Sequence, residues 1–194
     1  MIETPLSPVA EYSVEERQLL LRWAHQSIRA RLEGRELDHR APTAHLEEKR
    51  GAFTTLHTHG KLRGCIGFVE ARYPLYRTIH ETAQSAAFHD PRFPPVRINE
   101  LPLLQIEISV MSPLKPIAPA DVRVGVHGLM ISKGGRAGLL LPQVATEWGW
   151  DRETFLTQTC HKAGLPGDAW QTGAEIEAFT AEVFGEDAPG SSLP

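Results

Sequence analysis

The most constraining feature of this sequence is one segment, residues 104–111, in which apolar and polar side chains alternate. The apolar set is Leu104, Ile106, Ile108 and Val110, and the residues between them are Gln105, Glu107 and Ser109. Because successive side chains of a strand point to opposite faces, this pattern predicts a strand with one face in a hydrophobic core. Glu107 is expected to project from the other, non-core face.

Segments typical of helices and hairpins flank this strand. Ser13 and Glu16 have the spacing of a capping box and precede a helical apolar pattern, which predicts a helix over 14–33 that ends at Gly34. Two β-forming runs, 53–57 and 62–69, surround a glycine-containing turn at His59-Gly60 and predict a hairpin. A further helix is expected to follow Pro74 and to reach residue 88.

The C-terminal half predicts a second hairpin, a helix and a last strand. The hairpin spans 128–141, the helix is capped by Asp151 and ends at Gly164, and the strand covers 176–184. Strands and helices do not alternate in β-α-β order, which favours an α+β fold with a central, largely antiparallel sheet and flanking helices. A chain of 194 residues fits one domain, ordered over about 11–187, or one domain with a smaller second lobe.

Composition excludes several classes of protein. The net charge of −4 offers no general attraction to nucleic-acid backbones or anionic membranes, so nucleic-acid binding is not expected. No export signal and no run of about 18 apolar residues is present, which predicts a cytoplasmic protein. Cys65 and Cys160 are therefore expected to be free thiols. The spacings of metal sites and phosphate-binding loops are missing, so no metal and no cofactor are predicted.

The segment that most strongly suggests a functional site is Leu62-Arg63-Gly64-Cys65-Ile66-Gly67, which combines a guanidinium, a thiol and two glycines. A hairpin turn centred on His59-Gly60 places Leu56 opposite Arg63 and Thr54 opposite Cys65, so that Arg63 and Cys65 share one face. A guanidinium beside a thiol favours the nucleophilic thiolate. In this register His57 lies on the opposite face, which disfavours a Cys–His pair.

The glycines and the thiol of this segment have an alternative interpretation. Gly64 and Gly67 leave room for a ligand or for another backbone, and they are equally typical of bulges. Cys65 can be a small buried hydrophobic residue instead of a reactive group. Packing in the core and a functional groove both remain open from the residues alone.

Three other residues are candidates for a functional site. Asp90 and Arg92 lie on a loop stiffened by Pro91, Pro94 and Pro95, where they can present fixed charges or simply pair with each other. His127 lies between Gly125 and Gly128, which permit close approach, although a lone histidine there can also serve as a structural hydrogen-bonding group.

Together these segments resemble the AMMECR family, whose bacterial and archaeal members are named protein A of the AmmeMemoRadiSam system. The similar blocks are residues 62–67, 90–95 with Glu100-Leu101, 124–128, 138–145 with Gly149-Trp150-Asp151, and 160–166 with Trp170. They run in order from about residue 53 to 184. The resemblance implies a two-lobed α+β fold with a groove near residues 62–67. It also implies a Memo-type protein and a radical-SAM protein as partners, but no established reaction.

The resemblance and the residues lead to three hypotheses. In the first, the protein is an accessory component of a modification system that holds a substrate or partner at a groove lined by Arg63 and Cys65. In the second, it is an enzyme with Cys65 as covalent nucleophile, and in the third it binds RNA. Within the groove, Arg63 is expected to bind a small anionic group, and Asp90 and His127 to move protons. The remaining candidate ligand-binding residues are Gly64, Gly67, Arg92 and Glu107.

Overall fold

The computed structural model describes residues 10–38 and 40–186 of the chain. The expectation of order up to residue 187 therefore extends just outside the described residues. The chain divides into two compact units. The first unit comprises Met1–Val110 and Glu182–Pro194, and the second unit comprises Met111–Ala181. Among the helices of the described residues, none has the length and apolar character needed to cross a membrane.

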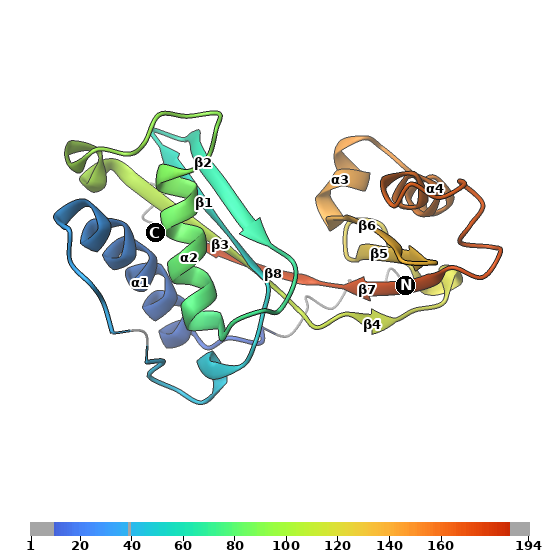
Figure 1. Cartoon of the computed structure of the whole chain (residues 1–194), viewed down its shortest axis with the longest axis horizontal. Coiled ribbons are helices and arrows are strands. Elements are labelled where there is room, and N and C mark those ends of the chain that lie inside the picture. Colours follow the sequence, from blue (N-terminus) through green and yellow to red (C-terminus); the bar gives the residue numbers. More distant parts are fainter. Residues whose placement is uncertain (1–9, 39, 187–194) are drawn as a thin grey trace, which may run out of the picture. The chain divides into compact units, whose positions relative to one another are not determined.

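Two helices of the first unit pack on the same sheet. Helix α1 (Val14–Glu33) begins with the predicted capping box of Ser13 and Glu16 and ends at Gly34, whose φ of 65° is left-handed. Helix α2 (Leu75–Phe88) buries Leu75, Ile79 and Ala83. Figure 1 shows α1 and α2 side by side, with α2 against the sheet. Both helices confirm the sequence prediction. The short 3₁₀ helices η1 (His45–Glu47) and η2 (Ile98–Leu103) lie in the connections.

The sheet of the first unit has the strand order β2-β1-β3-β8. Its strands are β1 (Ala52–Thr58), β2 (Lys61–Phe68), β3 (Leu104–Met111) and β8 (Ala181–Gly185). Strand β1 pairs antiparallel with both β2 and β3. Residues 104–110 of β3 alternate between buried and half-buried, as the period-two pattern predicted. The buried face of the sheet, with Leu56, Ile106 and Ile108, forms the core with α1 and α2.

A β-bulge corrects the predicted register of the β1–β2 hairpin. The pairs next to the turn, Thr58–Lys61 and His57–Leu62, fit a two-residue turn, in which His59 and Gly60 have φ of 53° and 71°. Arg63 is then the extra residue, because Leu56 pairs with Gly64 and Thr55 with Cys65. The expected pairs Leu56–Arg63 and Thr54–Cys65 are therefore wrong.

The second unit has its own sheet, with the order β4-β7-β5-β6. The strands are β4 (Lys115–Pro116), β5 (Gly128–Lys133), β6 (Arg136–Leu140) and β7 (Glu175–Phe179), and their pairs are antiparallel. Helix α4 (Arg152–Lys162), capped by Asp151 as predicted, packs on β5 and β6. The unit also contains η3 (Pro119–Asp121) and α3 (Pro142–Glu147).

The predicted α+β class is confirmed, with two four-stranded sheets where a central, largely antiparallel sheet was expected. The predicted last strand is divided between these two sheets. Residues 176–184 form β7 and β8, which are separated by Thr180 and belong to different units. Thr180 and Ser112 exchange hydrogen bonds where the chain passes between the units, from Ser112 N to Thr180 O and from Thr180 N to Ser112 Oγ. Both cysteines are free thiols, as expected.

Candidate functional site

Cys65 lies on the non-core face of the first-unit sheet. Its cross-strand partner Thr55 alternates with the core residues Thr54 and Leu56, so the Thr55–Cys65 pair points away from α1 and α2. The hydroxyl of Thr55 donates a hydrogen bond to the Cys65 sulfur over 3.3 Å. We call this surface the Cys65 face. Its residues are Phe53, Thr55, His57, Leu62, Cys65, Gly67, Gln105, Glu107 and Ser109. Of the two interpretations left open by the sequence, core packing of Cys65 does not fit, because the residue is half-buried.

Asp90 and Arg92 fix the backbone of Cys65 at the outer edge of β2. The Cys65 amide donates to Asp90 Oδ2 over 2.9 Å, and Arg92 Nη2 donates to the Cys65 carbonyl over 3.3 Å. Both backbone groups of Cys65 therefore point away from β1, which identifies Thr55–Cys65 as a non-hydrogen-bonded pair with closely spaced side chains. The loop 90–95 thus holds the thiol-bearing residue in place.

The Asp90 carboxylate is a fixed anion. Its side chain is 2% exposed, and its oxygens accept hydrogen bonds from the Cys65 amide and from the amide, Nε and Nη2 of Arg92. The hydrogen bond from the Arg92 guanidinium holds the pKa of this carboxyl well below its usual range, and the amide bonds lower it further. A carboxylate that stays ionised near neutral pH is suited to positioning, which argues against the proton-moving role expected for Asp90.

Arg63 is held by a different carboxylate. Its Nε donates to Glu100 Oε1 over 2.8 Å and its Nη2 to Glu100 Oε2 over 3.3 Å, with the two side chains 13% and 25% exposed. The guanidinium lowers the pKa of Glu100. Nη1 of Arg63 is buried and, in the part of the chain that the structure describes, has no hydrogen-bond partner. The guanidinium that lies next to Cys65 is that of Arg92, whose side chain is 54% exposed.

Both glycines of the segment are required by close packing within the first unit. A Cβ built on Gly64 would lie 2.2 Å from the carbonyl oxygen of Ala86 in α2. A Cβ on Gly67 would lie 2.4 Å from both the Ala52 carbonyl oxygen and the Phe53 ring. The room that these glycines leave is filled by the protein's own atoms, which accounts for them without a ligand.

His57 and Glu107 share the Cys65 face. Thr55 pairs with Cys65 on β2 and with Glu107 on β3, and His57 follows Thr55 by two residues on β1. His57 was expected on the other face of the sheet from Cys65, and because of the bulge it lies on the same face. His57 and Glu107 are half-buried, and within residues 10–38 and 40–186 neither side chain forms a hydrogen bond or an ion pair.

His127 belongs to the second unit, whereas Cys65, Asp90, Arg63, Arg92 and Glu107 all belong to the first. The Arg123 amide donates to His127 Nδ1 over 3.2 Å, which ties the histidine to its own loop. Burial lowers the pKa of His127, and the charge of Arg123 lowers it further. This contact gives His127 a structural hydrogen bond, and a catalytic role for it stays a prediction.

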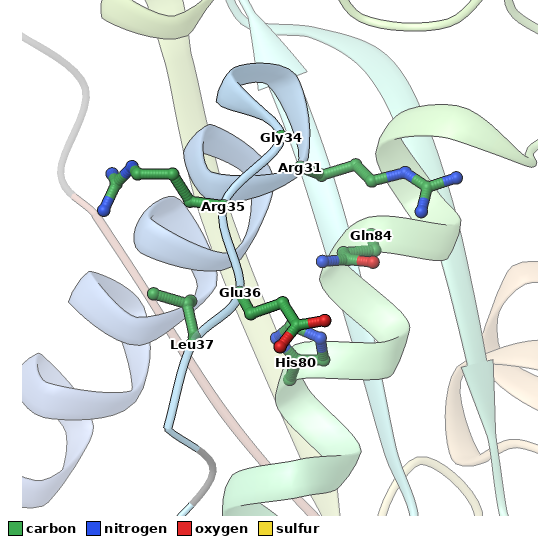
Figure 2. Close-up of a pocket in the computed structure, with 7 residues that line it drawn as sticks. All are labelled: Arg31, Gly34, Arg35, Glu36, Leu37, His80 and Gln84. Atoms are coloured by element: carbon green, nitrogen blue, oxygen red, sulfur yellow. The ribbon is translucent and has the colours of Figure 1, made fainter.

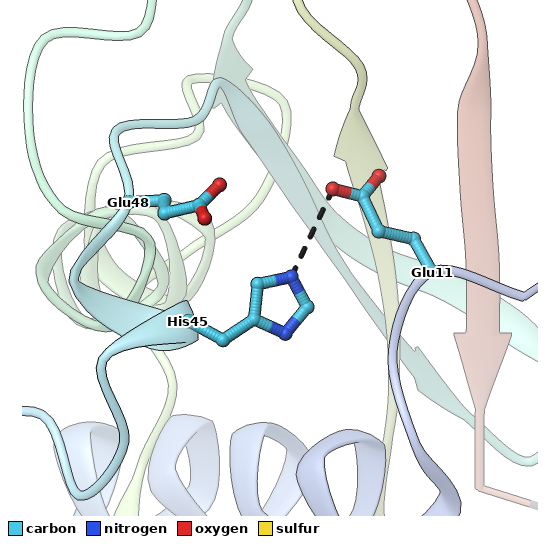
Figure 3. Close-up of side chains that lie close together, drawn as sticks. All are labelled: Glu11, His45 and Glu48. Atoms are coloured by element: carbon cyan, nitrogen blue, oxygen red, sulfur yellow. Dashed lines mark ion pairs between the residues drawn. The ribbon is translucent and has the colours of Figure 1, made fainter.

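A polar cluster outside the Cys65 face contains Glu11, His45 and Glu48 (Figure 3). One potential ligand atom from each lies within 4.8 Å of the others. However, Arg50 Nη2 lies 2.8 Å from Glu11 Oε1 and 2.7 Å from Glu48 Oε2, so a cationic group already bridges the two carboxylates. His45 also pairs with Glu16 over 3.0 Å. These contacts describe an ion-pair network, and they do not require a metal.

A pocket of about 620 Å³ opens beside the C-terminal end of α1 (Figure 2). Its lining includes Arg31 and Glu36 from the end of α1 and the following turn, and His80 and Gln84 from α2. Figure 2 shows Glu36 beside His80, while Arg35 points away from them. His80 Nδ1 lies 3.0 Å from Ser27 Oγ, and Gln84 donates a hydrogen bond to the Ser27 carbonyl. Both side chains of α2 therefore hold α2 to α1.

Sequence reasoning did not identify Thr55, His57 or Glu100 as members of the site. Thr55 and His57 depend on the register beyond the bulge, which no local signal fixed. Glu100 had a detectable signal, because it is the acidic residue of the block that follows the proline-rich loop. The structure brings Cys65, Asp90, Arg92 and Glu107 into one part of the first unit.

Comparison with known proteins places this chain in a family. The model of the AMMECR1 family matches residues 21–184. A protein of Methanothermobacter thermautotrophicus is 44% identical, with 92% of this chain and 98% of that protein covered, and one of Thermococcus gammatolerans is 49% identical, with 74% and 76% covered. The crystal structure of the uncharacterized protein PH0010 from Pyrococcus horikoshii is similar at 42% identity and a TM-score of 0.72, covering 88% of this chain and 91% of that one. This chain belongs to the AMMECR1 family.

Proposed function

We propose that this protein is an accessory component of an AmmeMemoRadiSam-type modification system in the cytoplasm, and that it holds a substrate or partner segment on the Cys65 face. The family resemblance supports a Memo-type protein and a radical-SAM protein as its partners. The arrangement of the first unit supports the location of the binding surface.

The observation that carries this proposal is a set of half-buried polar groups without internal partners. The side chains of His57 and Glu107 make no hydrogen bond within the described residues, and because both are partly exposed, their polar atoms can bond to another molecule. They surround a thiol whose backbone is locked by Asp90 and Arg92. A rigid surface with unused hydrogen-bonding groups is suited to binding another molecule.

The rival function is an enzyme that uses Cys65 as a covalent nucleophile. The placement of His57 on the same face favours it, because a nearby imidazole can accept the thiol proton. The exposed guanidinium of Arg92 beside Cys65 gives a small anionic group a place to bind, a role that was expected of Arg63. No feature of the site favours the third hypothesis, RNA binding.

Affinity measurements with charge-reversal variants test the docking surface. The full chain is titrated against the purified Memo-type and radical-SAM proteins of the same genome by isothermal calorimetry. Glu107→Lys on the Cys65 face is compared with Glu81→Lys on the exposed side of α2, where Glu81 pairs with Arg77. We expect Glu107→Lys to weaken binding by about tenfold or more, since a misplaced charge at an interface costs over 1 kcal/mol. Glu81→Lys should retain the wild-type affinity.

Cys65→Ser separates the two functions. A docking surface keeps its partner affinity in this variant, because serine retains the size and the hydrogen bond of the side chain. A nucleophile loses all activity in this variant, because the serine hydroxyl is a far weaker nucleophile than a thiolate. If neither partner binds the wild-type chain, or if both charge reversals have the same effect, the docking proposal is overturned.

A further inference from the structure

Three chemically active side chains occupy adjacent positions on three neighbouring strands of the Cys65 face. Thr55 on β1 stands between Cys65 on β2 and Glu107 on β3, in one cross-strand row. His57, two residues further along β1, is therefore a diagonal neighbour of both Cys65 and Glu107. Diagonal neighbours in an antiparallel sheet lie roughly 7–8 Å apart at their Cα atoms, a distance that long and aromatic side chains span.

The order of these groups across the sheet is thiol, imidazole, carboxylate. An imidazole that stands between a thiol and a carboxylate can take the thiol proton on one side and be held by the carboxylate on the other. In the structure His57 is not hydrogen-bonded to either group, and both His57 and Glu107 lack other partners within residues 10–38 and 40–186. Both are therefore available, and catalytic hydrogen bonds often tighten only when substrate is bound.

The thiol is the most rigidly placed of the three groups. Asp90 and Arg92 hold its backbone, and Thr55 donates a hydrogen bond to its sulfur. Gly67 on the same strand is covered by the Phe53 ring, so this side of the thiol is packed. On the other side of the thiol lie the bulge at Arg63 and the exposed Leu62, whose cross-strand partner is His57. His57 therefore lies on the side of the thiol that Phe53 does not cover.

We propose that Cys65, His57 and Glu107 form a cysteine acyl-transfer site, with Cys65 as nucleophile, His57 as proton carrier and Glu107 as the residue that positions the His57 ring. This inference deepens the rival function of the same face, the enzyme with Cys65 as covalent nucleophile, and gives its substrate a class, the activated acyl esters and thioesters. His57 accepts the proton from Cys65 Sγ while the sulfur bonds to the carbonyl carbon. The bond to the leaving oxygen or sulfur then breaks, and His57 returns the proton to that leaving group.

The test uses 4-nitrophenyl acetate as the acyl donor and the full chain as the enzyme. The release of nitrophenolate is followed in time, and intact-protein and peptide mass spectrometry locate the acetyl group. The variants are His57→Gln, Glu107→Gln and Cys65→Ser, with His59→Asn as the matched control, since His59 is an exposed imidazole at the hairpin turn with φ of 53°. Circular dichroism and thermal melts establish that each variant folds, and Cys65→Ala replaces Cys65→Ser should the latter not fold.

The wild-type chain is expected to carry one acetyl group, on Cys65. His57→Gln should lower the acetylation rate by about 10²-fold, the lower range for loss of a general base. Glu107→Gln should lower the rate severalfold in the wild-type background and have no effect once His57 is replaced. His59→Asn should acylate like the wild type.

Two results overturn the inference. The first is acetylation of His57→Gln at the wild-type rate. The second is acetylation of residues other than Cys65. Either can occur while Glu107→Lys still weakens partner binding, in which case the docking function survives and the acyl-transfer site does not. If partner binding is absent but Cys65 is acetylated as expected, the acyl-transfer site survives and the docking function does not.

Discussion

The amide of Cys65 donates a hydrogen bond to Asp90 Oδ2 over 2.9 Å, across 25 positions of sequence. This contact closes the outer edge of β2 at the residue whose side chain carries the thiol. Because Arg92 binds both the same carboxylate and the Cys65 carbonyl, the loop and the strand edge form one hydrogen-bonded assembly. The chemistry of Cys65 therefore depends on a loop that sequence spacing alone does not connect to it.

Replacement of Asp90 is expected to change how stability depends on pH. The Arg92 guanidinium holds the pKa of Asp90 below its unfolded value, so the ionised carboxylate stabilises the folded protein above about pH 4 and loses this effect as the pH falls further. Asp90→Asn lacks this contribution. The difference in unfolding free energy between wild type and variant, measured in urea, should be full at about pH 7 and clearly smaller at about pH 2, because the contribution is lost only as the pH falls from the unfolded toward the folded pKa of Asp90. A constant difference at both pH values contradicts this account.

Gly64→Ala is expected to destabilise the protein by overpacking. Its added Cβ would meet the Ala86 carbonyl oxygen of α2 at 2.2 Å, and neither backbone can move without disturbing the core. We expect a loss of about 1–3 kcal/mol in the free energy of unfolding. Gly185→Ala in β8 is the control, because its Cβ would make an ordinary contact of 3.4 Å with Glu107. Equal losses from the two substitutions would show that the approach of α2 does not require Gly64.

The two cysteines are expected to differ in accessibility. Cys65 is half-buried on the Cys65 face, whereas Cys160 is 0% exposed in the core of the second unit, where burial raises the pKa of its thiol. Iodoacetamide should therefore add one group to the native protein, at Cys65, and a second at Cys160 only after unfolding. Peptide mass spectrometry identifies the modified residue. A native protein in which Cys65 resists the reagent would remove the basis of both proposed functions.

Arg63→Met is expected to lower stability and to leave thiol labelling unchanged. The substitution leaves the Glu100 carboxylate without its two charge-assisted hydrogen bonds, at a cost of about 1.5–3 kcal/mol. The double variant Arg63→Met/Glu100→Gln should recover part of this loss, which identifies the pair as the cause. Since Arg63 is bonded to Glu100 and not to Cys65, iodoacetamide should label Cys65 at the wild-type rate. If iodoacetamide labelled Cys65 severalfold more slowly in Arg63→Met, Arg63 would activate the thiol, as expected from the sequence.

Local patterns in the sequence determined which elements form. The capping box at Ser13 and Glu16, the alternation of residues 104–110 and the turn at His59-Gly60 each involve neighbours along the chain. Such interactions depend on backbone conformation and on nearby side chains, so the residues themselves are sufficient evidence for them. The α+β class followed from these elements, as did the identity of residues 62–67 as a strand that carries a thiol.

Tertiary structure alone decided how that strand faces its surroundings. The bulge at Arg63 shifts the pairing by one residue, and in a sheet such a shift moves a side chain to the opposite face. It brought His57 to the side of Cys65 and separated Arg63 from it. The same holds for the Asp90 and Arg92 contacts and for the division of residues 176–184 between two sheets. These features arise from partners distant in sequence, whose hydrogen bonds leave no periodic pattern in the chain.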